Sequence, residues 1–328
     1  MKVIVPLAGK GTRLLPLTKR VPKPLVHVAG RPVMDYVMDT VAGFDVEELL
    51  VITGHLKHDV ERYITTHYGV PARFVEQKTL DGTAGAINLA RPWVDGPVMI
   101  IFVDTLFDAD LSLIRTSDAD GILWAKEVED YQRFGVIVTD DQGNMTRIVE
   151  KPDTPISRLA NIGLYYIRDW RTLFDGIAAV LGGKAGKGGE FYLTDAFQFM
   201  VDRGKRLQVA SVGGWYDCGK VDTLLETNEH LLRNGRAITP PPQTGVIIRE
   251  PVRIEPGVTL RACSIGPNVT VELGSVIEQS NVERSILGRD VRIRGSTVTG
   301  SVIGDGQSLE GQTLTESVMD RGEIAVAR

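Results

Sequence analysis

The hydrophobic pattern of this 328-residue chain changes once, and that change limits the folds open to it. In the first part, short apolar runs alternate with stretches of helical spacing. Helical spacing then stops, and the proline run 240–242 and Gly245 punctuate the chain. We therefore predict a first domain over residues 1–236, a Pro-rich linker over 237–245 and a second domain over 246–328.

The first domain is expected to be an α/β domain built on a mostly parallel, doubly wound sheet of the Rossmann-like type. Strands that alternate with helices favour such a sheet, with helices on both faces. Its ligands bind at the carboxyl ends of the strands, so polar residues that follow strands are the first candidates for a site. Apolar runs predict strands at 2–7, 49–53, 72–76 and 98–103, and helical spacing predicts helices at 33–41, 58–67 and 83–90.

The second domain repeats a short motif: an aliphatic residue, three spacers, an aliphatic residue, one spacer and a third aliphatic residue. Glycines at likely corners separate the repeats, as in short strands that stack into a β-helix around one aliphatic ladder. An irregular β-sandwich is the alternative. The motif occurs at Ile254/Val258/Leu260, Ile265/Val269/Val271 and Leu287/Val291/Ile293 and in part at Ile303/Gln307/Leu309, with glycines at 257, 266, 274, 288 and 304.

Charge is distributed unevenly along the chain. The 37 Lys and Arg residues against 42 Asp and Glu give a net charge of −5, which argues against a general nucleic-acid binder. Residues 1–34 nevertheless contain seven basic side chains and no acidic one. We expect this segment to bind an anion.

Neither targeting to a membrane nor disulfide chemistry is indicated. No apolar run approaches the roughly 20 residues of a membrane helix, and residues 1–7 lack the apolar core of a signal peptide. Cys218 and Cys263 lie far apart, without C-x-x-C spacing or a neighbouring histidine. We expect a cytoplasmic protein with no disulfide or zinc site.

A Gly-rich turn directly after the first strand is the strongest motif. Gly9 and Gly11 let backbone amides approach a phosphate, and Thr12, Arg13 and Lys23 add hydrogen-bond donors and positive charge. The turn is neither a P-loop nor a dinucleotide fingerprint, because it lacks G-x-x-x-x-G-K-[ST] and a third glycine. The combination predicts a polyphosphate site, and an ordinary tight turn is the alternative.

Ordered motifs over roughly residues 1 to 235 resemble the sugar-phosphate nucleotidyltransferases, most closely the glucose-1-phosphate thymidylyltransferases and uridylyltransferases. The resemblance implies the doubly wound sheet already predicted, here with a short C-terminal left-handed β-helix. The motifs are G-x-G-T-R-L-x-P-x-T at 9–18, P-K-P at 22–24, Glu76-Gln77, Gly82-Thr83-Ala84, Asp104-Thr105, Phe134-Gly135-Val136, Glu150-Lys151-Pro152, Asn161-Ile162-Gly163, Glu190-x-x-Leu193-Thr194-Asp195 and Trp215-Tyr216-Asp217-x-Gly219.

The resemblance implies attack of a sugar 1-phosphate oxygen on the α-phosphorus of a nucleoside triphosphate, with release of pyrophosphate. Arg13 and Lys23 are then the catalytic cations, because they bind the triphosphate and balance the developing charge. Mg²⁺ takes one or two carboxylates plus phosphate oxygens, and the resemblance gives these roles to Asp104 and Asp217. A helix N-cap or a turn is the alternative for Asp104, and a turn is the alternative for Asp217.

The same resemblance divides the remaining site residues between base and sugar. Gln77 offers amide groups that match the N3–H and adjacent carbonyl of a pyrimidine, with the backbone of Leu7, Ala8 and Gly82 beside it. Thr194 and Asp195 are expected to cap a helix. The sugar 1-phosphate is assigned to Gly135, Glu150, Lys151, Asn161 and Gly163; a surface ion pair is the alternative for Glu150 and Lys151.

Several alternatives stay open. We predict dTTP with glucose 1-phosphate, and UTP next, because thymine and uracil present the same edge to Gln77. Gly82 to Gly85 also resembles guanylyltransferases for mannose 1-phosphate, and residues 102–105 lack the glycine that many relatives place before the aspartate.

A sensor that binds a nucleotide sugar without turnover is an alternative class of function. Acyl transfer is disfavoured because all five histidines precede the tail, which we expect to support a homo-oligomer.

Overall fold

The computed structural model describes residues 1–327, which form two compact units. The first unit contains Met1–Gly9 and Val37–Trp215, and the second contains Lys10–Tyr36 and the chain from Tyr216 onward. The basic segment that follows the first strand therefore belongs in space with the C-terminal part of the chain. The predicted domain boundaries at residues 236 and 246 divide the chain by sequence position, whereas these units group segments that lie together in space. The domain boundaries therefore stay a prediction.

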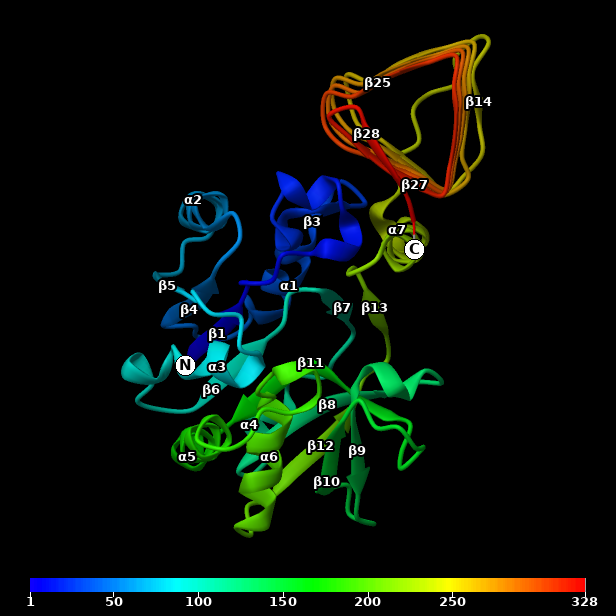
Figure 1. Ribbon diagram of the computed structural model, residues 1–328. Helices are drawn as coiled ribbons and strands as arrows, with labels where there is room; N and C mark the ends of the chain where they lie inside the picture. The colour runs from blue at the N-terminus through cyan, green and yellow to red at the C-terminus, as the bar shows by residue number, and fades with distance from the viewer. Residues whose placement is uncertain (328) are drawn as a thin grey trace. The chain divides into compact units, whose positions relative to one another are not determined.

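The first unit is built on one mixed sheet, which has nine strands in the described part of the chain (Figure 1). Strand β1 (Lys2–Pro6) pairs in parallel with β4 (Glu48–Thr53) and β6 (Val98–Ile101), and β4 pairs in parallel with β5 (Ala72–Glu76). Strand β11 (Leu159–Ile167) is antiparallel to β6 and reverses the direction of the sheet. The other four strands of the sheet are β8 (Gly121–Glu127), β9 (Gly135–Thr139), β10 (Met145–Glu150) and β12 (Leu207–Ser211). The order is β10-β9-β11-β6-β1-β4-β5, and β8 joins β12 to β11.

Helices bury both faces of this sheet, as the doubly wound prediction requires. On one face, α3 (Thr83–Asn88), α5 (Trp170–Leu181) and α6 (Leu193–Asp202) share a core with side chains such as Ile4 and Leu50. Side chains of the opposite face, such as Val3 and Leu49, are also fully buried. The remaining elements of the unit are α2 (Lys57–His67), β7 (Thr105–Phe107) and α4 (Leu113–Thr116), while α1 (Val33–Val41) and β13 (Trp215–Asp217) each have residues in both units.

Three predicted elements end early, and the first of them, β1, stops at Pro6 rather than at 7. Strand β6 stops at Ile101 rather than at 103, because β11 leaves its regular register at Gly163, whose φ is +78°. The Phe102 N–H then donates to the Gly163 carbonyl at 2.9 Å, and Asp104 lies in the turn before β7. Helix α3 ends at Asn88 rather than at 90.

The second unit carries a β-helix, which confirms that prediction over the β-sandwich. Three parallel sheets form its sides, and the coils trace a triangle in Figure 1. The sides are β14 (Ile247–Ile248), β17 (Ser264–Ile265), β20 (Asn281–Glu283), β23 (Thr297–Thr299) and β26 (Thr313–Thr315); β15 (Val252–Ile254), β18 (Val269–Val271), β21 (Ile286–Leu287), β24 (Val302–Ile303), β27 (Ser317–Asp320) and the antiparallel β28 (Glu323–Val326); and β16 (Thr259–Arg261), β19 (Val276–Glu278), β22 (Arg292–Arg294) and β25 (Ser308–Glu310).

The predicted ladder is the core of the β-helix. Ile265, Leu287 and Ile293 are buried, and Gln307 occupies a ladder position with only 7% of its surface exposed. Its amide compensates for this burial, because Nε2 donates to the Asp305 carbonyl at 2.9 Å and Oε1 accepts from the Gly322 N–H at 3.0 Å.

The basic segment and helix α7 complete the second unit. Residues 10–36 form three 3₁₀ turns, η1 (Thr12–Leu14), η2 (Leu17–Lys19) and η3 (Lys23–Leu25), and a hairpin of β2 (His27–Val28) and β3 (Arg31–Pro32). Helix α7 (Val221–Leu231) precedes the β-helix. Among the described residues, no helix combines the length and the apolar character needed to cross a membrane.

Candidate active site

Arg13, Lys23 and Asp217 meet in the second unit, around Gly219. A Cβ placed on Gly219 would lie 2.8 Å from Asp217 Oδ1 and 3.3 Å from both Arg13 Nη2 and Lys23 Nζ. Asp217 Oδ1 also accepts the Gly219 N–H at 2.7 Å. Two predicted cations and one predicted metal ligand therefore share one small region, and glycine leaves the space between them open.

The local fold of the Gly-rich turn explains how Arg13 and Lys23 are brought together. Gly11 has a φ of +64°, which favours glycine, and a Cβ there would lie 3.0 Å from Thr18 Cγ2 and 3.2 Å from Lys23 Cβ. The buried Thr18 hydroxyl donates to the Gly11 carbonyl at 2.8 Å. Thr12 and Arg13 follow in η1, whereas a Cβ on Gly9 would have no neighbouring atom within 4 Å among the described residues.

In the first unit, the residues assigned to the base lie at the ends of β1 and β5. The Leu7 N–H donates to the Ile52 carbonyl at 2.7 Å, and a Cβ on Gly54 would lie 2.7 Å from the Ala8 carbonyl oxygen. The buried Gln77 follows β5, and its backbone N–H donates to the Thr53 carbonyl at 2.8 Å. These strand ends are the edge at which doubly wound sheets bind ligands.

The Gln77 amide is already oriented by its neighbours. Nε2 donates to Asp81 Oδ1 at 3.0 Å and to the Gly82 carbonyl at 3.2 Å. Gly82 itself has a φ of +115°, and a Cβ there would overlap the backbone of Phe191. Both amide hydrogens of Gln77 are thus engaged within the protein, and its pairing with a pyrimidine base stays a prediction.

The residues assigned to the sugar form a second cluster in the first unit, around Gly135. Asn161 Nδ2 donates to the Gly135 carbonyl at 3.0 Å. A Cβ on Gly135 would overlap Asn161 Nδ2 and lie 2.8 Å from Glu150 Oε2, which accepts from the Thr194 hydroxyl at 3.2 Å. Carboxylate and amide groups that lie together in this way can bind sugar hydroxyls.

Burial sets the electrostatics of this cluster. Burial raises the pKa of Glu150 above its ordinary value, and Lys151 and the Thr194 hydroxyl act in the opposite direction. Lys151 Nζ lies 3.9 Å from Glu150 Oε1 and 5.0 Å from the centre of the Tyr192 ring. Burial also raises the pKa of Asp195.

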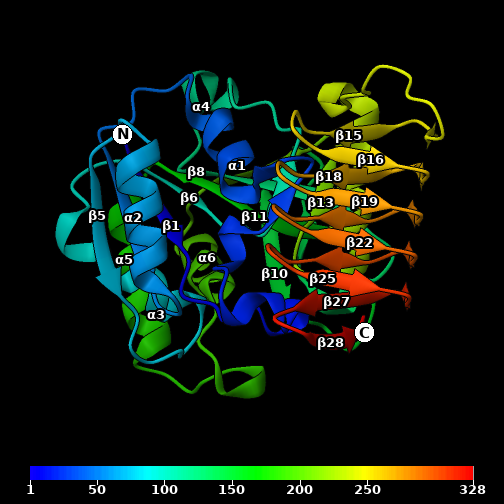
Figure 2. The ribbon, with the colours of Figure 1, turned by 90° about the horizontal axis from the view of Figure 1, so that it is seen from above.

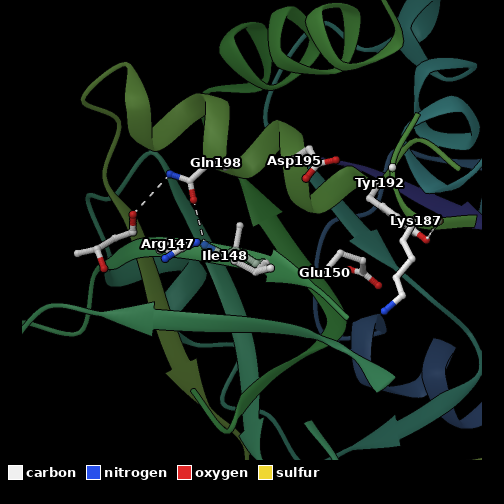
Figure 3. Close-up of a pocket in the computed structure, with 10 residues that line it drawn as sticks. Arg147, Ile148, Glu150, Lys187, Tyr192, Asp195 and Gln198 are labelled. Carbon is white, nitrogen blue, oxygen red and sulfur yellow. Dashed lines mark hydrogen bonds between the residues drawn. The ribbon is translucent and has the colours of Figure 1, made fainter. Parts of the chain in front are cut away.

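A pocket of about 470 Å³ opens beside Glu150 (Figure 3). Figure 3 shows Glu150, Tyr192 and Lys187 toward one end and Arg147 and Gln198 toward the other. Ionisable and polar side chains make up much of its wall, so it suits a hydroxylated or charged ligand. The lining residues are Thr146, Arg147, Ile148, Val149, Glu150, Gly186, Lys187, Tyr192, Asp195 and Gln198.

Asp104 lies within electrostatic range of the sugar cluster. Burial raises the pKa of Tyr165, and the negative charges of Glu150 and Asp104 raise it further. The Tyr165 hydroxyl donates to Asn161 Oδ1. Gly163 packs against Phe102, because a Cβ on Gly163 would lie 2.9 Å from Phe102 Cβ. Phe102 directly precedes the turn that contains Asp104.

The carboxylates are suitable donors for Mg²⁺, although they do not form a ready-made cage. In the described part of the chain, no group of three or more His, Cys, Asp or Glu side chains could hold a metal ion. Mg²⁺ needs only one or two carboxylates when phosphates and water supply its other ligands. Asp217 belongs to the second unit and Asp104 to the first, so their joint role stays a prediction.

The predictions missed two contributors and misplaced a third. Thr18 and Gly219 shape the cationic region, and both stood in motifs quoted for the resemblance. The prediction that Thr194 and Asp195 cap a helix was wrong: α6 has Tyr192 at its N-cap, without a side-chain cap, and Thr194 lies in its first turn. Its hydroxyl is directed to Glu150 instead.

Comparison with known proteins defines the class. The family described as nucleotidyl transferase matches residues 2–234, and the chain belongs to that family. The chain is 32% identical to the bifunctional protein GlmU of Methanococcus aeolicus over 262 residues, which are 80% of this chain and 62% of that protein. It thus spans about three-fifths of the GlmU relatives that it matches.

Particular relatives carry different names. The chain is 30% identical to the UTP–glucose-1-phosphate uridylyltransferase AglF of Haloferax volcanii, with 66% of this chain and 89% of that protein covered. It is 26% identical to a glucose-1-phosphate thymidylyltransferase of Streptomyces griseus, covering 90% and 89%. A crystal structure of UDP-glucose pyrophosphorylase complexed with UDP-glucose matches with a TM-score of 0.63 and 27% identity, over 71% of this chain and 98% of that one.

Proposed function

We propose that this protein transfers a nucleotidyl group from a nucleoside triphosphate to a sugar 1-phosphate and releases pyrophosphate. The observation that carries this proposal is the meeting of Arg13, Lys23 and Asp217 around Gly219. Two cations beside a carboxylate can bind a polyphosphate and contribute to a metal site. The family match and the cluster around Gly135 support the same reaction.

In the proposed reaction, an oxygen of the sugar 1-phosphate attacks the α-phosphorus in line. A new P–O bond forms as the bond to pyrophosphate breaks, without a covalent enzyme intermediate. Arg13 and Lys23 bind the triphosphate and balance the charge that builds on the leaving group. This role requires positioning and positive charge rather than a protein nucleophile.

The other site residues orient the two substrates. Gln77 accepts a base N–H through Oε1, with Leu7, Ala8 and Gly82 beside it. Gly9, Gly11 and Thr12 bring backbone amides to the phosphates. On the acceptor side, Gly135, Glu150, Asn161 and Gly163 bind sugar hydroxyls, and Lys151 binds the sugar phosphate.

Mg²⁺ is the proposed cofactor, held by Asp104 and Asp217 together with phosphate oxygens. When bound, it would neutralise phosphate charge and help to align the reacting groups. Carboxylate oxygens are the ligands that this hard cation prefers.

For the substrates, we propose dTTP with glucose 1-phosphate, and UTP next. Relatives with thymidylyltransferase and uridylyltransferase names support both. Gln77 Oε1 accepts equally well from the N3–H of thymine or uracil, so this residue does not separate the two bases. A mannose-1-phosphate guanylyltransferase is a weaker alternative.

A two-dimensional screen tests the proposal: five nucleoside triphosphates against common hexose 1-phosphates, with products separated by chromatography. Pyrophosphate should appear only when both substrates and Mg²⁺ are present. Asp104→Asn and Asp217→Asn should each lower kcat sharply, whereas Asp118→Asn, an exposed acid paired with Arg206, should not. Failure of every pairing would reject the assignment, and tight product binding in calorimetry without turnover would favour the sensor.

We also propose a homo-oligomer formed through the β-helix. Strand β28 pairs with β27 and covers its edge. Within the described residues, the other two sheets end in β25 and β26, and no further strand pairs with the outer edges of these two strands. Unpaired strand edges can pair with another copy. Light scattering of the purified chain would give the mass of the assembly, and a monomer would contradict the proposal.

A further inference from the structure

The β-helix and the basic segment of the second unit share an extended set of contacts. We propose that the β-helix positions the phosphate segment, defined as residues 10–30, and that Asn228 and Glu272 are the positioning residues. This inference rests on the proposed function, because Arg13 and Lys23 lie in that segment. It gives the β-helix a part in nucleotide binding in addition to assembly.

Asn228 joins three parts of the unit at a fully buried position. Its Oδ1 accepts the Ala29 N–H at 3.0 Å and the Thr270 hydroxyl at 2.7 Å, and its Nδ2 donates to the Asn268 carbonyl at 3.4 Å. Helix α7, the end of the phosphate segment and strand β18 are thereby linked through one side chain. Buried hydrogen bonds of this kind define position, because a lost partner cannot be replaced by water.

Glu272 makes the next link. This carboxylate is 3% exposed, and its Oε1 lies 2.7 Å from His27 Nδ1. Its Oε2 lies 3.4 Å from Arg289 Nε, which comes from the next coil. Only Val26 separates His27 from η3, the turn that contains Lys23. A shift of His27 is therefore expected to move the Lys23 side chain.

Further contacts continue to the last coil. Arg253 of β15 lies against Gly30, and a Cβ on Gly304, after β24, would lie 3.3 Å from Leu17 Cδ1. Arg20 is 3.7 Å from Asp320 of β27, and Lys19 pairs with Glu323 of β28.

These contacts follow a single side of the β-helix. They involve strands β15, β18, β27 and β28, which belong to one sheet. They also involve residues that follow β18, β21 and β24, which are strands of the same sheet. Figure 2 shows how these strands are stacked in order. The segment crosses them in the reverse direction, from Gly30 at the first coil to Lys19 at the last. A contact set distributed over the whole stack can hold the segment as one piece.

The test uses the full chain with the substitutions Thr270→Val and Glu272→Gln, separately and together. Thr270→Val removes one hydrogen bond from Asn228, and Glu272→Gln removes the charge beside His27 and Arg289. The matched controls are Thr259→Val and Glu278→Gln on a different sheet of the β-helix, where Glu278 pairs with Arg261. Thr270→Ser keeps the hydroxyl and serves as the conservative variant.

Amide hydrogen exchange and steady-state kinetics give two readouts. We expect exchange in residues 10–30 to accelerate about tenfold in the double variant, with residues 37–215 unchanged. KM for the nucleotide should rise about tenfold, while KM for the sugar phosphate stays within about twofold. The controls and Thr270→Ser should resemble the original chain.

Unchanged exchange in residues 10–30 of the double variant would overturn the inference, as would an equal rise of both KM values. Hydrogen exchange needs no turnover, so it tests whether the β-helix positions residues 10–30 even if no substrate pair reacts. In that case the proposed function fails, while faster exchange of the phosphate segment still supports its positioning by the β-helix.

Discussion

Thr194 Oγ1 donates a hydrogen bond to Glu150 Oε2 at 3.2 Å. The two residues come from α6 and the end of β10, and they meet beside Gly135 and Asn161. A hydroxyl from the first turn of a helix thus orients the carboxylate proposed to bind the sugar.

Replacing Thr194 by Val should weaken sugar binding. The hydroxyl lowers the pKa of Glu150, so its loss should raise that pKa further. We expect KM for the sugar 1-phosphate to rise about fivefold to tenfold, and the acid limb of kcat/KM to move to higher pH. Steady-state kinetics across pH measure both. Thr194→Ser keeps the hydroxyl, and if it behaves like Thr194→Val the hydrogen bond is not the cause.

Glu150→Gln should separate stability from activity. Burial raises the pKa of Glu150 in the folded state. The favourable contribution of this carboxyl group to the free energy of unfolding is therefore fully present below its ordinary pKa, and it is lost as the pH rises through the raised pKa. The variant should therefore melt higher than the original chain at neutral pH, and the difference should disappear in acid. Sugar binding should weaken about tenfold. A melting difference independent of pH would contradict this account.

Gly219→Ala should impair nucleotide use more than folding. Its Cβ would lie 2.8 Å from Asp217 Oδ1, so the carboxylate or the two cations must move. We expect kcat/KM for the nucleotide to fall about a hundredfold, because small displacements of reacting groups are costly. Gly213→Ala is the matched control, since its nearest atoms would be 3.7 Å away. Equal kinetics in the two variants would show that Gly219 needs no open space.

Gln307→Leu should destabilise the β-helix although it completes the aliphatic ladder. The Gln307 amide hydrogen-bonds to the backbone of Asp305 and Gly322. Its Nε2 also lies 3.4 Å from Oδ1 of Asp320, and burial raises the pKa of this aspartate. Loss of these partners should cost about 1–3 kcal/mol, which is measurable as a lower thermal midpoint. Gln312→Leu, at an exposed position, is the control. A more stable Gln307→Leu would mean that apolar burial outweighs the lost hydrogen bonds.

Much of the local structure could be predicted from residue patterns. Helical spacing predicted the observed limits of α1, an apolar run predicted those of β5, and the aliphatic ladder predicted the β-helix. The end of β6 could not be predicted, because it depends on where β11 leaves its register at Gly163. Such a pairing is made between strands distant in sequence, which a local pattern does not record.

By itself, the sequence determined the alternation of strands and helices, the repeat that stacks into coils, and the residue types with phosphate and sugar chemistry. Only the tertiary structure decided that residues 17–30 lie on a β-helix sheet and that Thr194 is directed to Glu150. The physical reason is that a hydrophobic pattern specifies which face of a segment is buried, whereas the partner of that face is selected by packing and hydrogen bonding across the whole fold.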